Sequence, residues 1–268
     1  MKHPAVVRRA VLLLSLAGGT AVRSLEGQAT LGYLPTYDLY SYGYGGPNLL
    51  VFSAALNAAF AGTNHVVMLP GLNGSLGGTT SLMLELQAVG TYFTGFTATQ
   101  SAKLSTFIAS GRRMVIFGDN YAWPSWNNAI ASLVGGTYIP QNPCSWSYSG
   151  PAVNTALTAG VTTVRPACAS YLAGGQQLFA DPYIHLWGST ANVLTIMDVN
   201  TCDDAHIGVA DNGVFCSNVA TWLATPPPPP PVIDPADPTS VTPEPTAILL
   251  MASGLGLLAG AGLVRRRR

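Results

Sequence analysis

The chain has 268 residues, of which 48% are hydrophobic and only 9% are charged. Its formal net charge is zero, but between residues 30 and 241 four basic residues face ten acidic ones, which makes this central part acidic, near −6. Because no basic stripe is present to neutralise a nucleic-acid backbone, the composition argues against DNA or RNA as a partner.

The first 29 residues have the features of a secretory signal peptide. Two arginines precede an apolar run over residues 10–17, and the tripeptide GQA at 27–29 fits the small-x-small pattern of a cleavage site. The alternative is a first buried helix, but the apolar run is short and its basic residues lie on the side that a signal peptide requires. We expect residues 1–29 to direct export through the general secretion machinery, and residues 30–225 to form the exported domain.

The exported domain begins with an aromatic segment, YLPTYDLYSYGYGGP, at residues 33–47. Its Tyr, Gly and Pro content predicts loop and turn. The aromatic rings have two possible uses, stacking on sugar rings or packing against the domain, and packing is the favoured interpretation.

Helical and strand patterns then alternate along the chain. Apolar runs of strand length separate segments with the helical period. This alternation predicts one α/β domain with a mostly parallel sheet covered by helices on both faces. The expected helices are 49–61, 97–111, 126–134 and 214–224, and the expected strands are 65–69, 82–89, 114–117 and 192–198.

The clearest unit is the helix at 97–111 and the strand that follows it. Thr97 and Gln100 have the spacing of a capping box, and a glycine ends the helix. The strand MVIF leads into Gly118-Asp119-Asn120. Parallel sheets bind ligands at the carboxyl ends of their strands, so Asp119 and Asn120 are candidate ligand contacts; the alternative is that they cap the next helix.

The run of helix, glycine, two arginines and MVIFGDN resembles the class I glutamine amidotransferase-like fold, a relative of the flavodoxin-like fold. The resemblance covers about residues 49–224. In that fold the turn after the strand carries a nucleophilic cysteine, whereas this turn has none. The resemblance therefore implies the architecture without the enzyme's active site, and it implies no function.

Four cysteines all lie in the exported domain, as expected for an exported chain with two disulfides. Four cysteines allow three pairings, and loop closure favours neighbours in sequence, which are Cys144–Cys168 and Cys202–Cys216. No C-x-x-C pair is present, which argues against a zinc ribbon or a thioredoxin-type site.

An acidic segment near the end of the domain, DVNTCDDAHIGVADNG at 198–213, is the main candidate for chemistry. Oxygen ligands at this density suit Ca²⁺, although the spacing does not fit an EF-hand. The alternative, which we favour, is a solvated acidic loop held by a disulfide. His206 lies among these acids and is a further candidate for ligand binding, whereas the sequence indicates no catalytic residue and no other cofactor. The candidate metal ligands are Asp198, Asn200, Asp203, Asp204 and Asp211.

The C-terminal part has three features in a fixed order. Residues 226–241 form a proline-rich linker that cannot build a core, and Pro243-Glu244-Pro245 follows it. Residues 247–264 contain 18 residues without a charge. As a helix they would span about 27 Å, which is enough to cross a hydrocarbon core. The chain closes with four arginines, which the positive-inside rule keeps cytoplasmic.

This combination over residues 242–268 resembles the PEP-CTERM sorting signal of Gram-negative bacteria. The resemblance implies recognition by an exosortase, a membrane-embedded transpeptidase-like enzyme, and processing near the tripeptide Pro243-Glu244-Pro245. The prolines fix φ and disfavour helix, which leaves the tripeptide extended and accessible beside the membrane. The alternative is an ordinary single-span anchor.

The sequence thus predicts an exported protein that is tethered to the membrane, or processed by an exosortase and located in the periplasm, at the cell surface or in the extracellular matrix of a biofilm. We expect it to be noncatalytic, with extracellular polysaccharide as its candidate partner. The alternative is a divergent enzyme that acts on extracellular glycan or glycoconjugate. The absence of G-x-S-x-G and the scarcity of histidine favour the noncatalytic interpretation.

Overall fold

The computed structural model describes residues 29–35, 42–62, 65–76, 78–87, 93–141, 144 and 147–225. The chain divides into two compact units, Met1–Pro227 and Pro228–Arg268, and every described residue belongs to the first. The predicted signal peptide (apart from its last residue), linker, sorting tripeptide and membrane span lie outside the described residues. No described helix is both long enough and apolar enough to cross a membrane.

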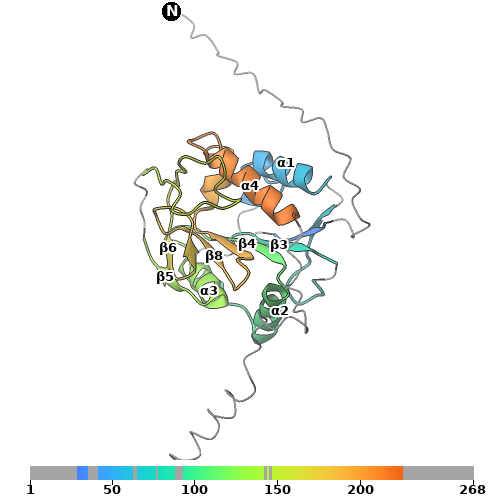
Figure 1. The fold of residues 1–268 in the computed structure, drawn as a ribbon. Helices are drawn as coiled ribbons and strands as arrows, with labels where there is room; N and C mark the ends of the chain where they lie inside the picture. The colour runs from blue at the N-terminus through green and yellow to red at the C-terminus, as the bar shows by residue number, and fades with distance from the viewer. Residues whose placement is uncertain are drawn as a thin grey trace, which may run out of the picture. The chain divides into compact units, whose positions relative to one another are not determined.

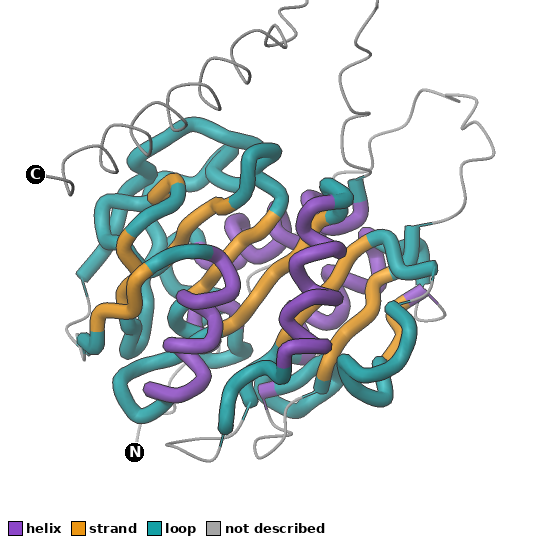
Figure 2. The backbone as a smooth tube through the Cα atoms, turned by 90° about the horizontal axis from the view of Figure 1, so that it is seen from below, coloured by secondary structure: helices purple, strands orange, loops and turns teal. Residues whose placement is uncertain are grey.

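The described domain is a central sheet between two layers of helices (Figure 1). Helices α1 and α4 cover one face, and α2 and α3 cover the other. Figure 2, seen from below, shows helices crossing the strands on the second face. The elements in chain order are β1 (Leu31–Leu34), α1 (Leu50–Ala59), β2 (Val66–Met68), β3 (Ser81–Leu84), α2 (Ala98–Ala109), β4 (Arg113–Phe117), α3 (Pro124–Val134), β5 (Thr137–Ile139), β6 (Tyr171–Ala173), β7 (Gln176–Gln177), β8 (Ile184–Trp187), β9 (Val193–Ile196), η3 (Val199–Cys202) and α4 (Asn212–Ala224).

The sheet has seven strands in the order β2-β1-β3-β4-β9-β8-β7. The five strands from β2 to β9 are parallel, and β8 runs antiparallel between β9 and β7. A separate antiparallel pair is formed by β5 and β6. The prediction of a mixed α/β domain with a mostly parallel sheet and flanking helices is confirmed.

Burial on both faces explains the character of the central strands. All residues of β3, β8 and β9 are buried, as are the last four of β4. The strand predicted at 82–89 is shorter in the structure: β3 ends at Leu84, and both of its faces are covered. Such strands are continuous apolar runs, as expected for the centre of a parallel sheet.

Two parts of the sheet differ from the sequence prediction. Tyr33 and Leu34, assigned to a loop, belong to β1, which lies between β2 and β3 and pairs with both. The strand β8 was not predicted, and its antiparallel course departs from the simple alternation of strand and helix. In β1, pairing with two neighbouring strands overrides the turn propensity of the Gly- and Pro-rich sequence around it.

Helix α2 begins with the predicted capping box. The Thr97 hydroxyl accepts a hydrogen bond from the Gln100 N–H at 3.2 Å, and the Gln100 side chain accepts one from the Thr97 N–H at 2.9 Å. Two N–H groups that would otherwise lack a helical partner are thereby satisfied.

We expect Thr97→Ala to lower the free energy of unfolding by about 1 kcal/mol, because the cap is lost while α2 keeps its buried side chains. Urea denaturation measures this change. Thr99→Ala, which removes the same atoms from an exposed position in the same turn, is the control. An equal loss in both variants would show that the cap contributes nothing specific.

Candidate functional site

Three neighbouring parallel strands end in buried carboxyl side chains at the same edge of the sheet. Glu85 follows β3, Asp119 follows β4 after one glycine, and Asp198 lies two residues beyond β9. The register of the parallel pairs brings these strand ends together. Glu85 is 2%, Asp119 7% and Asp198 0% exposed. This carboxyl edge is the place where parallel sheets bind ligands.

The turn that carries Asp119 is held by Asn127, a fully buried residue of α3. The Asn127 Nδ2 donates to the carbonyl oxygens of Asp119 (2.7 Å) and Asn120 (3.1 Å), and its Oδ1 accepts from the Asp119 N–H at 3.2 Å. A Cβ on Gly118 would lie 2.7 Å from the end of the Met197 side chain and 2.9 Å from the Asn127 Oδ1, so any larger residue there would displace Met197 and Asn127. The position of Asp119 is therefore fixed by packing.

The Asp119 carboxyl is in an environment that favours its protonated form. Burial raises its pKa to about 8, the charge of Asp198 contributes to the increase, and the Asn120 N–H, at 2.8 Å, opposes it. Asp203 raises the pKa further. Asp119 therefore changes its charge near neutral pH, which distinguishes it from an ordinary surface aspartate.

The Asp198 carboxyl is more buried but better supplied with donors. It accepts N–H bonds from Ala167 at 2.6 Å and from Asn200 at 3.2 Å. Burial raises its pKa to about 6, while these two N–H groups and His206 lower it. The charge of Asp198 raises the pKa of Asp119, and Asp203 raises the pKa of both, so the carboxyl groups of this edge do not all ionise together.

Asp203 and His206 form a pair at the same edge. The Nδ1 of His206 lies 2.7 Å from the Asp203 Oδ1, which also accepts the His206 N–H at 2.8 Å. Asn200 donates to the other oxygen of Asp203 at 2.6 Å and to the Tyr42 hydroxyl at 3.4 Å. The candidates Asp119, Asp198, Asp203 and His206 thus lie within electrostatic range of one another.

The other sequence candidates have local roles. Asp204 accepts hydrogen bonds from the N–H groups of Leu50 (3.2 Å) and Val51 (2.9 Å), so it caps α1 from a distant part of the chain. Asp211 accepts from the N–H groups of Thr162 (2.7 Å) and Thr163 (3.2 Å). Asp204 thus caps a helix and Asp211 holds a loop, and the two carboxylates bind different parts of the chain.

Asn120 also has a local role. Its Oδ1 accepts from the Ala122 N–H at 2.9 Å, which forms a turn before α3. The N-cap position of α3 is occupied by Trp123, without a side-chain cap. The alternative that Asp119 or Asn120 caps this helix is therefore wrong, although both lie close to its start.

The carboxyl groups of the acidic segment 198–213 accept hydrogen bonds from different parts of the chain. Within the described ranges, no three His, Cys, Asp or Glu side chains lie close enough together to hold a metal ion. Asp198, Asp204 and Asp211 each accept hydrogen bonds from backbone N–H groups. The calcium prediction for Asp198, Asn200, Asp203, Asp204 and Asp211 stays untested.

Tyr33 and Tyr44, two described residues of the aromatic segment, lie near the carboxyl edge. The Tyr44 N–H donates to the Glu85 carboxylate at 2.5 Å, and the Tyr44 ring packs on Tyr33 with ring centroids 4.9 Å apart. These contacts use the tyrosines for packing. Glu85 itself was missed as a site residue because the run LMLELQ was assigned to one long strand; the signal that identifies it is an acidic residue directly after four buried positions.

Comparison with known proteins identifies the fold alone. No family model matches the sequence, and no curated protein matches it. Among solved structures, the N-terminal domain of mmIFT52 has a TM-score of 0.53 at 12% identity, over 73% of this chain and 98% of that chain. The cytoplasmic protein STM3548 from Salmonella typhimurium has a TM-score of 0.48 at 9% identity, over 72% of this chain and 97% of that chain. Exo-β-1,4-mannosidase Op5Man5 from Opitutaceae bacterium strain TAV5 has a TM-score of 0.46 at 13% identity, over 75% of this chain and 36% of that chain.

The raised carboxyl pKa values predict that the domain loses stability as the pH rises. In the unfolded chain an aspartate has a pKa of about 3.9, so between about pH 4 and pH 8 the folded state binds more protons than the unfolded state. Asp119→Asn keeps a side-chain oxygen that accepts the Asn120 N–H but cannot ionise. We expect this variant to be more stable than the wild type at about pH 9 by a few kcal/mol, and similar to it at about pH 4, near the pKa of the unfolded chain. Urea denaturation at the two pH values measures the difference.

Asp211→Asn is the control for this experiment, because the N–H groups of Thr162 and Thr163 lower the pKa of Asp211. Its contribution is present above the unfolded pKa and is lost as the pH falls, which is the opposite dependence. If Asp119→Asn retained the full alkaline loss of the wild type, Asp119 would not be the group responsible.

Proposed function

We propose that this chain is an exported, noncatalytic surface or matrix protein that associates with extracellular polysaccharide. One observation carries the export part of the proposal: all four cysteines form disulfides, Cys144–Cys168 and Cys202–Cys216, and none is free. Disulfides of this kind form and persist in oxidising compartments. The pairs are those that loop closure favours, with sequence separations of 24 and 14 residues.

The second disulfide also supports the carboxyl edge. Cys202 ends η3 and Cys216 lies in α4, and both are buried. Asp203 follows Cys202 directly, so the bridge fixes the backbone next to the Asp203–His206 pair. A closed loop of about 15 residues stabilises a fold by roughly 3 kcal/mol in the chain-entropy account. Oxidation during export would thus be coupled to the order of this edge.

The proposal for the C-terminal segment comes from its sequence. The tripeptide Pro243-Glu244-Pro245, the uncharged run 247–264 and the terminal arginines are the basis for a membrane tether that an exosortase processes. The proline-rich run 226–241 would act as a stiff spacer between the domain and the membrane. From the sequence resemblance we also propose that the α/β domain belongs to the glutamine amidotransferase-like group of folds.

A second candidate function is hydrolysis of an extracellular glycan. The gathering of Asp119 with the Asp203–His206 pair favours it, because glycoside hydrolysis uses one carboxyl group that keeps its proton near neutral pH and a second group that activates water. Asp119 would protonate the leaving oxygen, and the Asp203–His206 pair would take the proton of the attacking water. The 7% exposure of Asp119 limits its access to a substrate, which is why we place this function second.

The sorting proposal predicts the mass of the mature protein. Expressed in a Gram-negative host that contains an exosortase, the chain should lose both the signal peptide and the segment after the tripeptide. Glu244→Ala or Pro243→Ala should leave the C-terminal segment attached, because the recognition sequence is changed. Pro238→Ala, a proline of the linker outside the tripeptide, should be processed normally.

Intact-mass measurement, with thiol alkylation before reduction, reports the cleavage and both disulfides together. A full-length, fully reduced chain in the cytosol would contradict the proposal.

The enzymatic candidate predicts release of reducing ends from a glycan panel. If it holds, Asp119→Asn and His206→Gln should each lower the rate by roughly a hundredfold or more, since each removes a proton carrier. Asp211→Asn should leave the rate unchanged. A wild-type rate that does not exceed that of Asp119→Asn would remove this candidate and retain the noncatalytic function.

A further inference from the structure

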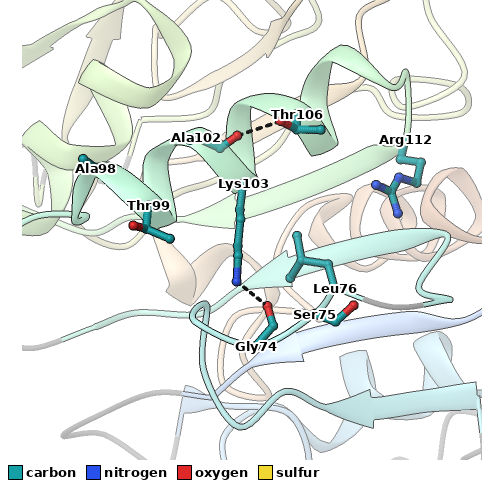
Figure 3. A pocket seen from close by; sticks show the side chains of 9 residues that line it. All are labelled: Gly74, Ser75, Leu76, Ala98, Thr99, Ala102, Lys103, Thr106 and Arg112. Atoms are coloured by element: carbon teal, nitrogen blue, oxygen red, sulfur yellow. Dashed lines mark hydrogen bonds between the residues drawn. The ribbon is translucent and has the colours of Figure 1, made fainter.

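A hollow of about 750 Å³ lies beside α2, away from the carboxyl edge, where the loop before β3 faces the helix (Figure 3). It is open to solvent along one side, which suits an extended chain better than a small enclosed ligand. We name it the α2 groove. The residues that line it include two cations (Lys103 and Arg112), three hydroxyl groups (Ser75, Thr99 and Thr106) and one aliphatic side chain (Leu76).

Lys103 extends from α2 across the groove to the opposite loop (Figure 3). Its Nζ donates to the carbonyl oxygens of Gly74, at 2.7 Å, and Asn73. These two bonds fix the ammonium group and leave one of its three N–H donors. Carbonyl oxygens orient a charge but do not neutralise it, so Lys103 presents a positioned positive charge to the groove.

Arg112 is held at another side of the groove, with Ser75 and Leu76 lying between it and Lys103 in Figure 3. Its Nε donates to the Ser110 hydroxyl at 2.8 Å and its Nη1 to the Thr79 carbonyl at 3.1 Å, while the guanidinium lies 4.1 Å from the centre of the Phe107 ring. Burial lowers its pKa, which shows that the charge is partly desolvated. In the part of the chain that the structure describes, no carboxylate forms an ion pair with Arg112 or Lys103.

The distribution of charge makes this groove unusual within the domain. The acidic residues Glu85, Asp119 and Asp198 follow strands at the carboxyl edge, and Asp181 precedes the antiparallel β8 at the same edge. Arg112, by contrast, precedes β4 at the opposite edge. Of the four basic residues of the exported domain, two line the α2 groove, whose lining includes no acid. An anion is repelled from one end of the sheet and attracted to the other.

We propose that the α2 groove binds a carboxylated polysaccharide, with Lys103 and Arg112 as the groups that hold its uronate carboxylates. This inference rests on the proposed association with polysaccharide and names the ligand class and the place. The free side of the Arg112 fork suits a carboxylate, and Lys103 supplies a point charge. The hydroxyl groups of Ser75 and Thr99 match sugar hydroxyls, and Leu76 offers an aliphatic contact to the face of a ring.

Nucleic acid fits the groove less well. A phosphate backbone carries a charge at every nucleotide, and its binding depends on several cations in a row. The α2 groove has two, and the acidic carboxyl edge belongs to the same domain. A uronate chain, which alternates apolar ring faces with carboxylates and hydroxyl groups, uses the whole lining.

Isothermal titration of the full-length chain in a non-ionic detergent with a hexagalacturonate tests this proposal, with neutral maltohexaose and a short single-stranded DNA as comparison probes. We expect hexagalacturonate to bind and the two comparison probes to bind much more weakly. Lys103→Gln and Arg112→Gln should each raise its Kd roughly tenfold or more, as expected for loss of a charge-assisted hydrogen bond. Lys103→Arg should restore most of the affinity, and thermal unfolding of each variant shows that it is folded.

Ser217→Asp is the matched control, because it lowers the net charge by the same amount from an exposed position on α4, on the other face of the sheet. It should change the Kd less than about twofold at physiological salt. An equal effect of Ser217→Asp and Lys103→Gln, equal binding of maltohexaose or DNA, or no binding of hexagalacturonate would each overturn the proposal. The outcome is independent of sorting: a chain that is exported and processed but does not bind loses only the ligand assignment, and a chain that binds but remains reduced in the cytosol loses only the export.

Discussion

The burial of several carboxyl groups at one edge of the sheet is the constraint on which the described domain depends. Parallel pairing of β3, β4 and β9 brings the groups after these strands to one edge, and burial there disfavours their ionised forms. The domain compensates in two ways. Asp198 is supplied with backbone N–H donors, and Asp119 has a pKa raised to about 8, so that it holds a proton near neutral pH. Asp119 therefore ionises at a higher pH than Asp198, and the two groups do not ionise together.

The segments that surround this edge are cross-linked to the rest of the domain by long-range contacts. Asp204 caps α1 across 154 residues of sequence, Asp211 supports the loop at 162–163, and the Cys202–Cys216 bridge joins η3 to α4. Most of the carboxyl oxygens in these segments accept hydrogen bonds from backbone N–H groups, which lowers the cost of placing several acids close together. Most acids in this cluster therefore stabilise the fold through hydrogen bonds with backbone N–H groups. Any chemistry at this edge would depend on Asp119 and on the Asp203–His206 pair.

The sequence predicts the helices and the central strands of this fold better than it predicts which strands pair with one another. The α2 capping box and the strand β4 follow from local patterns, because Thr97, Gln100 and the run MVIF each determine their own backbone conformation. The strand β1 and the antiparallel β8 could not be predicted, since they depend on partners far away in sequence. The candidate site follows the same rule. Asp119 is recognisable because it comes directly after a strand, whereas its proximity to Asp203 and the capping role of Asp204 arise only from tertiary contacts.

Charge separation connects the carboxyl edge with the α2 groove. Carboxyl groups gather where the parallel strands end, while Arg112 and Arg113 lie where β4 begins, so the domain has an acidic end and a basic end along the strand direction. Arg113 donates to the Trp222 carbonyl and lies over the Trp222 ring, so its charge is used for packing. Arg112 packs on Phe107 in the same way but borders a hollow. The difference between these adjacent arginines is the strongest reason to regard the groove as a binding site: both are partly buried, and Arg113 is engaged by Trp222, whereas Arg112 lines a space that an anion can enter.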